Sequence, residues 1–239
     1  MADAGDGTCA TQAPQAIQFR TAFWGLIALT AGVRLVGLGR PLLGNFATKN
    51  CVYAMIARNW AEGRASLWYP TLDVLVGGQR ALHMLEFPVA AYLTAGLWRL
   101  FGGPLDAWGR AVSVAFSTAA VALVVLFMRR RHPLPAALAA GLALALSPVS
   151  IIYGQSFMLE ASLVFFTVAT VWAWDHWRES DRSGWLIAAV VCLALLLLTK
   201  IYMLVLVLPL VWGKSRVETK SRGARGEGSE EKSPLTASA

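Results

Sequence analysis

Long apolar runs are the feature that most limits how this chain can fold. Several stretches of roughly 15 to 20 residues carry few charges, close to the length that a helix needs to cross the apolar core of a bilayer. Hydrophobic residues make up 56% of the 239-residue chain and charged residues 15%, whereas soluble domains carry about 25% charged residues. The composition excludes an ordinary soluble domain and predicts an all-α fold, a polytopic bundle of transmembrane helices.

The apolar runs predict about six spanning helices. They cover approximately residues 20–39, 110–128, 135–152, 161–177, 185–199 and 202–213. Lys200 separates the last two, and because a charge in the middle of a bilayer is costly, we expect a break there, near one membrane face. The chain then consists of an N-terminal tail (1–19), a transmembrane module (20–213) and a disordered cytoplasmic tail (214–239) of low apolar content.

The distribution of positive charge predicts the orientation of the module. Arg129, Arg130 and Arg131 form a short basic turn, which the positive-inside rule places in the cytoplasm. The net charge of +7 is explained mainly by this rule, so no nucleic-acid partner is expected. The long loop 40–109 then lies outside. We expect an integral membrane protein with this loop on the outer side.

The apolar run 87–103 decides between two topologies. It contains Arg99 and ends in two glycines, which favours an interfacial or re-entrant helix along the membrane surface. If it crossed the membrane instead, the basic turn at 129–131 would move outside. We favour the first alternative, so loop 40–109 is expected to contain interfacial helices. Loops of this length are usually functional or disordered, and aromatic residues at helical spacing favour a folded, functional surface here.

Three ionisable residues from separate parts of the chain are expected to converge on the outer face. They are Glu86 in the loop, Glu160 between the third and fourth spans, and Lys200 after the fifth span. Ionisable groups at membrane depth are functional candidates by default. Each also has a structural alternative. Glu86 and Glu160 could be ordinary acids at helix starts, and Lys200 could extend to the lipid headgroups.

The order of short motifs resembles a known family. It reads YAMIARNW at 53–60, EFP at 86–88, LFG at 100–102, SP at 147–148 and LTK at 198–200. This order is similar to that of the membrane-embedded GT-C glycosyltransferases of the lipid A aminoarabinose transferase and protein mannosyltransferase type. The resemblance extends from residue 20 to about residue 212, and the first two motifs contribute most to it.

The resemblance implies that a sugar moves from a polyprenyl-phosphate donor, dissolved among membrane lipids, to a lipid, glycan or protein acceptor at the outer face. It also implies a bacterial inner membrane with the active face outward. Glu86 fits the family's acid that acts as base or positions the acceptor, and Glu160 and Lys200 fit the residues that help to bind the charged groups of the donor.

We expect Glu86 and Glu160 to be catalytic. The expected substrate-binding residues are Lys200, Tyr53, Arg58, Asn50 and Arg110. Arg58 could instead only cover a helix with its stem, and Tyr53 could belong to the face of an amphipathic surface helix. A carboxylate suits removal of the acceptor proton, and a Lys or Arg suits the leaving phosphate. No metal-ligand set is implied, and a divalent metal stays open as a cofactor.

Two departures from the family pattern favour a second hypothesis. The family usually has an Asp a few residues before the Tyr of the first motif, but residues 44–50 contain no carboxylate. Members of the family are also commonly twice as long, so a C-terminal half or a partner subunit could be missing. The alternative is a catalytically inactive homologue or fragment that acts as a lipid-phosphate-binding or assembly subunit.

Overall fold

The computed structural model describes residues 7–39, 46–84, 86–208 and 210, and these are mostly helical. The chain forms two compact units, Met1–Lys200 and Ile201–Ala239. The helices of the first unit are α1 (Gly7–Leu35), α2 (Ala47–Ala61), α3 (Val89–Phe101), α4 (Leu105–Arg129), α5 (Leu134–Leu146), α6 (Pro148–Gln155), α7 (Glu160–Ser180) and α8 (Ser183–Thr199). Its strands are β1 (Thr71–Val76) and β2 (Gln79–Leu82). The second unit contains a 3₁₀ helix, Ile201–Leu206.

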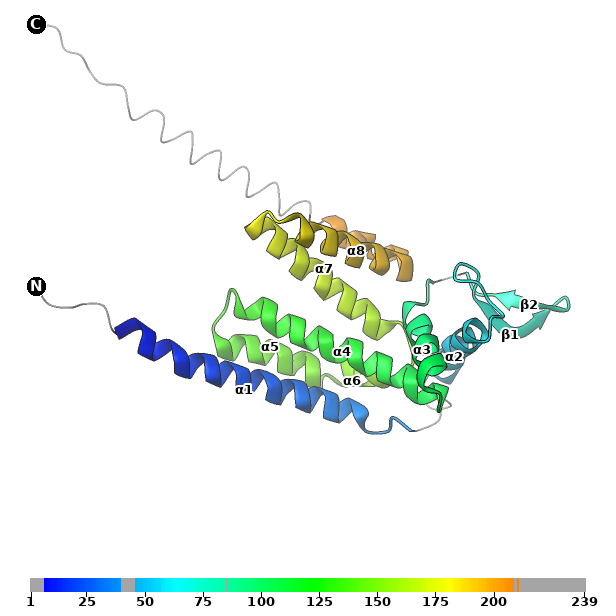
Figure 1. Ribbon diagram of the computed structural model, residues 1–239, viewed down its shortest axis with the longest axis horizontal. Helices are drawn as coiled ribbons and strands as arrows, with labels where there is room; N and C mark the ends of the chain where they lie inside the picture. The colour runs from blue at the N-terminus through cyan, green and yellow to red at the C-terminus, as the bar shows by residue number, and fades with distance from the viewer. Residues whose placement is uncertain (1–6, 40–45, 85, 209, 211–239) are drawn as a thin grey trace, which may run out of the picture. The chain divides into compact units, whose positions relative to one another are not determined.

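Helix α4 is the centre of the first unit, and α1, α3, α5, α6 and α7 all pack against it (Figure 1). Along α1 and α5 the contact is made by a small apolar core of Leu26, Val121, Val125, Ala137 and Ala145. All five side chains are buried. Alanine on α5 lets that helix lie close to α4, which gives dense packing without bulky side chains.

One helix of the described ranges, α4, is long and apolar enough to cross a membrane. Helices α5 and α6 would form a second span if they are taken together, although they are bent by 59°. Helices α3 and α8 are apolar but have only 13 and 17 residues. The expected helical character is therefore confirmed, whereas the expected set of about six spans stays a prediction.

Several expected helix boundaries are wrong. The first helix begins at Gly7 rather than near residue 20. The expected helix 135–152 is broken between α5 and α6, because Pro148 has no N–H and its ring clashes with the carbonyl of the preceding turn. Of the expected helix over 202–213, residues 202–206 belong to a 3₁₀ helix, and residues 207, 208 and 210 are α-helical. Residues 209 and 211–213 and all of the expected tail 214–239 lie outside the described residues.

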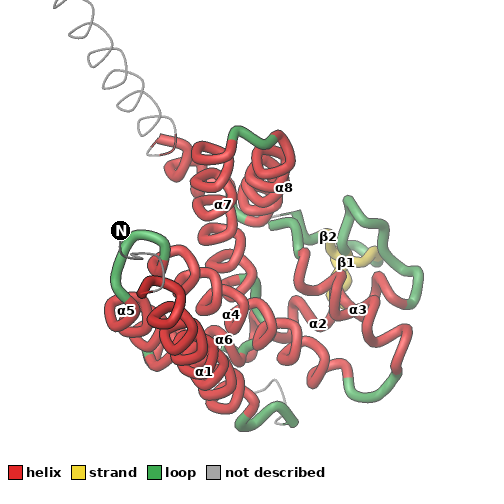
Figure 2. Tube along the Cα trace, turned by 60° about the vertical axis from the view of Figure 1, so that its left-hand side comes forward, coloured by secondary structure: helices red, strands yellow, loops and turns green. Residues whose placement is uncertain are grey.

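The expected external loop contains a hairpin that the sequence did not lead us to predict. Strands β1 and β2 pair in antiparallel fashion, and Figure 2 shows them beside α2 and α3. Gly77 and Gly78 form the turn with φ values of 58° and 78°, as a two-residue hairpin turn with positive φ at both positions requires. Asn59 on α2 donates a hydrogen bond from Nδ2 to the carbonyl of Thr71 at 3.0 Å, which fastens the hairpin to α2.

A second core joins the loop to the helices. It contains Tyr53 and Ile56 of α2, Ala91 of α3, Val112 of α4 and Phe157 of the turn between α6 and α7, with five further residues. Helix α2 therefore does not lie apart on a surface, because Ile56 is fully buried between other elements. This core is what connects the segment around residue 86 to the segment around residue 160.

We predict that Gly109→Ala destabilises the fold. A Cβ on Gly109 of α4 would lie 2.3 Å from the ring of Phe157, which is fully buried and has no free space to move into. Overpacking of this kind typically costs about 1–3 kcal/mol. Thermal unfolding in detergent should show a lower Tm. The control is Gly96→Ala on α3, where a Cβ meets nothing within 4 Å. It should leave the Tm unchanged or raise it, and an unchanged Tm for Gly109→Ala would contradict the packing.

Candidate functional site

Four charged side chains from four parts of the chain meet at one end of the first unit. Lys200 Nζ lies 3.1 Å from Glu86 Oε1 and 3.7 Å from Glu160 Oε1. Lys49 Nζ lies 3.5 Å from the same oxygen of Glu160. We call Lys49, Glu86, Glu160 and Lys200 the four-charge cluster. The Lys200 side chain is only 12% exposed, so its contacts with the carboxylates are largely shielded from solvent.

The backbone explains why these residues meet. The N–H of Phe87 donates to the carbonyl of Leu198 at 3.1 Å, which places Glu86 beside the end of α8. Helix α8 ends at Thr199, and Lys200 has an extended backbone with φ −149° and ψ 108°. Glu160 is the first residue of α7, where a carboxylate interacts favourably with the helix dipole. The expected break at Lys200 is therefore present.

The environment of Glu86 favours its charged form. Tyr53 donates a hydrogen bond from its hydroxyl to the second carboxylate oxygen, Oε2. Partial burial by itself raises the pKa of Glu86, but the hydrogen bonds from Tyr53 and Lys200 and the charges of Lys200 and Lys49 outweigh it, so the pKa is lowered overall. Burial and the adjacent Glu86 carboxylate raise the pKa of Tyr53, which stays a proton donor at neutral pH.

The second oxygen of Glu160 faces no hydrogen-bond donor in the described part of the chain. Glu160 Oε2 is buried, and the residue lines a cavity of about 320 Å³ between α4, α6 and α7. Ser117 of α4 lines the same cavity, and its hydroxyl likewise lacks a partner there. Buried polar atoms are nearly always hydrogen-bonded in native proteins. The two atoms are therefore suited to a ligand that has hydroxyl groups, or to water.

The other residues implied for substrate binding fall into different surroundings. Asn50 is buried on the face of α2 that also carries Tyr53. Arg110 donates from Nη1 to the carbonyl of Gln155 at 3.4 Å, next to the turn that leads to Glu160. Arg58 pairs with Asp73 of β1 and so holds the hairpin rather than the four-charge cluster. Of the expected substrate-binding residues, Tyr53 contacts Glu86 and Lys200 contacts both carboxylates. The substrate-binding roles of all five stay predictions.

Two residues of interest had no role assigned to them from the sequence. Lys49 lies four positions before Tyr53 on α2, so the helical spacing alone puts both on one face. Arg34 of α1 is 1% exposed within an apolar helix. A charge in such a helix is a functional candidate by default, and that rule could have identified it.

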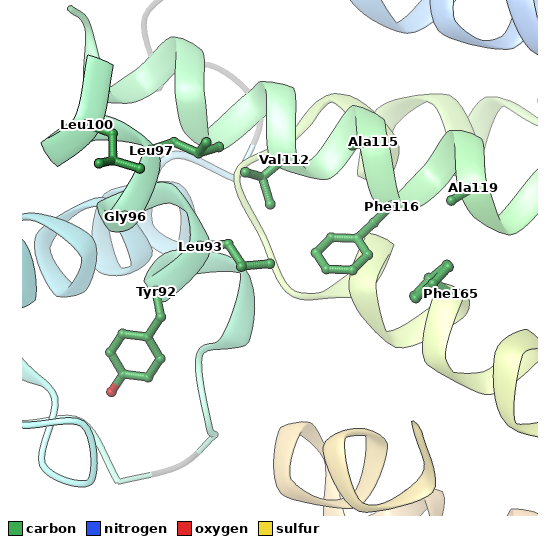
Figure 3. A pocket seen from close by; sticks show the side chains of 10 residues that line it. All are labelled: Tyr92, Leu93, Gly96, Leu97, Leu100, Val112, Ala115, Phe116, Ala119 and Phe165. Atoms are coloured by element: carbon green, nitrogen blue, oxygen red, sulfur yellow. The ribbon is translucent and has the colours of Figure 1, made fainter. Parts of the chain in front are cut away.

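An apolar cavity of about 550 Å³ opens between α3, α4 and α7 (Figure 3). Its lining residues are Tyr92, Leu93, Gly96, Leu97, Leu100, Val112, Ala115, Phe116, Ala119 and Phe165. The ring of Tyr92 packs against that of Phe87 with centroids 5.5 Å apart, and Phe87 directly follows Glu86. A residue that lines the apolar cavity therefore contacts the residue that follows Glu86 of the four-charge cluster.

A basic cluster lies at the other end of α7. Arg130 and Arg131, which follow α4, form ion pairs with Asp175 and Glu179 near the C-terminus of α7. Glu160 begins that helix, so at a rise of 1.5 Å per residue roughly 22 Å of helix separates it from Asp175. The basic turn and the four-charge cluster are therefore at opposite ends of one helix.

Metal ligands are not grouped in the described ranges. No three His, Cys, Asp or Glu side chains there are arranged to hold a metal ion. His83 stands in edge contact with Tyr53, at 6.3 Å between ring centroids, and burial lowers its pKa.

Comparison with known proteins identifies the family. Curated proteins and solved structures give no match to this chain. The family model described as dolichyl-phosphate-mannose-protein mannosyltransferase matches residues 86–217, which is more than half of the chain and includes Glu86, Glu160 and Lys200. The motif resemblance is confirmed, and the chain belongs to the dolichyl-phosphate-mannose-protein mannosyltransferase family of membrane glycosyltransferases.

Proposed function

We propose that this protein transfers a sugar from a polyprenyl-phosphate donor to a lipid, glycan or protein acceptor at the outer face of a bacterial inner membrane. The observation that carries the proposal is the four-charge cluster, in which Lys200 lies between the carboxylates of Glu86 and Glu160. Such a cluster combines the two chemical functions that the reaction needs, a cation for the leaving phosphate and a base for the acceptor hydroxyl.

The lysines are the proposed phosphate contacts. A phosphate suits these lysines for two reasons: it is negatively charged, and its oxygens are strong hydrogen-bond acceptors. Lys49 is 56% exposed on its side chain and can reach an incoming headgroup, whereas Lys200 is mostly buried. As the sugar–phosphate bond breaks, negative charge grows on the leaving phosphate, and Lys200 stabilises that charge.

Glu86 is the proposed general base. In the donor-free protein its pKa is held low by Tyr53 and Lys200 despite partial burial, so the carboxylate is ionised but weakly basic. When the donor phosphate draws Lys200 away, Glu86 loses a cationic neighbour and its basicity rises. The carboxylate then accepts the proton of the acceptor hydroxyl as that oxygen attacks the sugar. In this scheme Glu86 takes the part of the carboxylate that residues 44–50 lack.

The apolar cavity supports a lipid-linked donor. Its ten lining residues are apolar or aromatic except for the hydroxyl of Tyr92, and an isoprenoid chain has no polar atoms to satisfy. Through the Tyr92–Phe87 contact the cavity adjoins the segment that carries Glu86. If the isoprenoid tail of the donor lies in this cavity, its phosphate would lie near the four-charge cluster.

The proposed orientation rests on the basic turn. Arg130 and Arg131 lie at the end of α7 opposite Glu160, and the positive-inside rule favours a cytoplasmic position for such a turn. The four-charge cluster would then be at the outer face. We propose a polytopic arrangement in which α1, α5 with α6, α7 and α8 accompany α4 across the membrane. Helix α3, at about 20 Å, would lie along the surface.

An inactive, lipid-binding homologue is the second candidate. It is favoured by the lack of a carboxylate in residues 44–50. Both candidates retain the lysines and the apolar cavity, so they differ in transfer and not in lipid binding.

We predict that Glu86→Gln abolishes most transfer while polyprenyl phosphate still binds. Loss of a general base typically lowers the rate about 10²–10⁴-fold. Lys200→Met should instead weaken lipid binding, because a hydrogen bond to a charged group contributes about 1.5–3 kcal/mol. Both variants are measured as purified chains in detergent. Transfer is followed with a radiolabelled polyprenyl-phosphate sugar, and affinity for polyprenyl phosphate is measured by equilibrium binding.

Exposed charges at the other end of α7 supply the matched controls. Glu179→Gln and Arg178→Met remove the same kinds of charge away from the four-charge cluster, and both should leave transfer and affinity unchanged. Binding without transfer by the unmodified chain would favour the inactive homologue. Full transfer by Glu86→Gln would eliminate Glu86 as the base.

We predict that the contribution of Glu86 to stability disappears at low pH. Its pKa in the folded protein lies below the ordinary value of 4.5, so the folded state favours the ionised form. That contribution is complete above pH 4.5 and is lost as the pH falls through the lower, folded-state pKa. Unfolding midpoints of the unmodified protein and Glu86→Gln, measured from pH 7 to pH 3, should therefore converge on acidification. A gap that stays the same size from pH 7 to pH 3 would contradict the proposed ion pairing.

We predict that Ala115→Phe lowers affinity for long-chain polyprenyl phosphate. Ala115 lines the apolar cavity, and a benzyl side chain would fill part of its volume. A short, water-soluble alkyl phosphate has no tail to accommodate and should bind equally well to the variant. The control, Ala139→Phe, changes an exposed alanine of α5 outside the cavity. An equal loss of affinity for polyprenyl phosphate and for the alkyl phosphate would show that Ala115→Phe disturbs the phosphate site and not a site for the tail.

A further inference from the structure

The break between α5 and α6 leaves backbone carbonyls that the helix itself cannot satisfy. Pro148 has no N–H, so the carbonyl of Leu144, four residues earlier, loses its normal helical donor. The 59° bend also turns α6 away from the end of α5. A buried carbonyl without a donor is costly, so another group must supply one.

Arg34 of α1 supplies these donors. Its Nη1 donates to the carbonyl of Ala145 at 3.0 Å, and its Nη2 donates to the carbonyl of Leu144 at 3.5 Å. Nη2 also donates to Ser150 Oγ at 2.9 Å on the far side of the bend. One guanidinium group therefore contacts both helices of the broken pair, which suits its rigid fork of donors.

The burial of Arg34 shows how strongly the position is constrained. The side chain is 1% exposed, and in the described ranges both terminal nitrogens donate hydrogen bonds, Nε has no partner, and the group forms no ion pair. A buried charge is tolerated only when it is well hydrogen-bonded. A side chain that merely filled this space would be apolar, since that would avoid the cost of removing a charge from water.

The bend determines where α7 begins. Only Ser156–Leu159 separate the end of α6 from Glu160, and Phe157, Met158 and Leu159 are each at most 1% exposed. This short, packed connection has no slack to absorb a movement of α6. Gln155 at the end of α6 is also tied to α1, through a 2.9 Å hydrogen bond from Nε2 to the carbonyl of Val33.

We infer that Arg34 is a positioning residue that holds the α5–α6 bend and thereby places Glu160 in the four-charge cluster. The inference rests on the proposed function only where it gives Glu160 a part in donor binding. The placement of Glu160 is a structural statement that can be tested without any lipid.

Spin labels can report both the bend and the start of α7. In a variant whose cysteines are replaced by serine, one label pair at exposed positions, Ala136→Cys with Ile152→Cys, measures the distance across the bend. A second pair, Ala136→Cys with Val164→Cys, measures the distance from α5 to the first turns of α7. Arg34→Met should shift or broaden both distance distributions. Arg20→Met removes an exposed arginine from the same helix and should change neither.

Pro148→Ala separates a hydrogen-bonding role from space filling. Alanine restores an N–H that can reach the Leu144 carbonyl, so adding Arg34→Met to Pro148→Ala should change the distances much less than Arg34→Met does alone. Equal effects in the two backgrounds would overturn the inference. If Arg34→Met does not fold, Arg34→Lys and Ser150→Ala remove fewer of the same hydrogen bonds and should shift both distances in the same direction by less.

Polyprenyl-phosphate binding gives the functional readout. Affinity should fall on the order of tenfold or more in Arg34→Met, because small misplacements of binding groups are costly, and stay constant in Arg20→Met. Unchanged distances in Arg34→Met, or a shift across the bend without a shift of α7, overturn the inference. If the unmodified chain binds no lipid, the proposed function fails while the distance measurements still decide the role of Arg34.

Discussion

The contact of Lys200 with Glu86 and Glu160 joins three segments that are far apart along the chain. Glu86 precedes α3, Glu160 begins α7, and Lys200 follows α8. Each carboxylate would be costly in a partly buried place without a cation beside it, and the lysine would be costly without the carboxylates. The arrangement is therefore stable only when all three segments are in position, and the packing of α2, α3 and the 157–159 turn around it serves that requirement.

A cluster balanced in this way is well suited to a charged ligand. The two lysines and two carboxylates neutralise each other in the free protein, and an arriving phosphate can compete for the lysines. The same exchange would release Glu86 from the cation that keeps its pKa low. Under the proposed function, donor binding and activation of Glu86 as the base would thus be coupled through one side chain, Lys200.

The two ends of the first unit are organised by opposite requirements. At one end, carboxylates and lysines gather near an apolar cavity that opens between α3, α4 and α7. At the other, Arg130 and Arg131 are held by Asp175 and Glu179. Between them, Arg34 supplies hydrogen bonds to a helix that Pro148 interrupts. The charged groups Arg34, Arg130 and Arg131 thus each have identified partners within the first unit.

The sequence by itself determined the helical class, the family, the interruption at Lys200 and the candidacy of Glu86, Glu160 and Lys200, because these follow from composition, motif order and the cost of charge near lipid. It did not reveal the β1–β2 hairpin, because the loop 40–109 was read as a surface with interfacial helices and the turn signal of Gly77–Gly78 was not used. The contacts of Lys49, Arg58 and Arg34 also had to come from the tertiary structure. Which oxygen a lysine or arginine reaches depends on how α1, α2, α6 and α7 pack together, and that packing is set by contacts between residues that are distant in sequence.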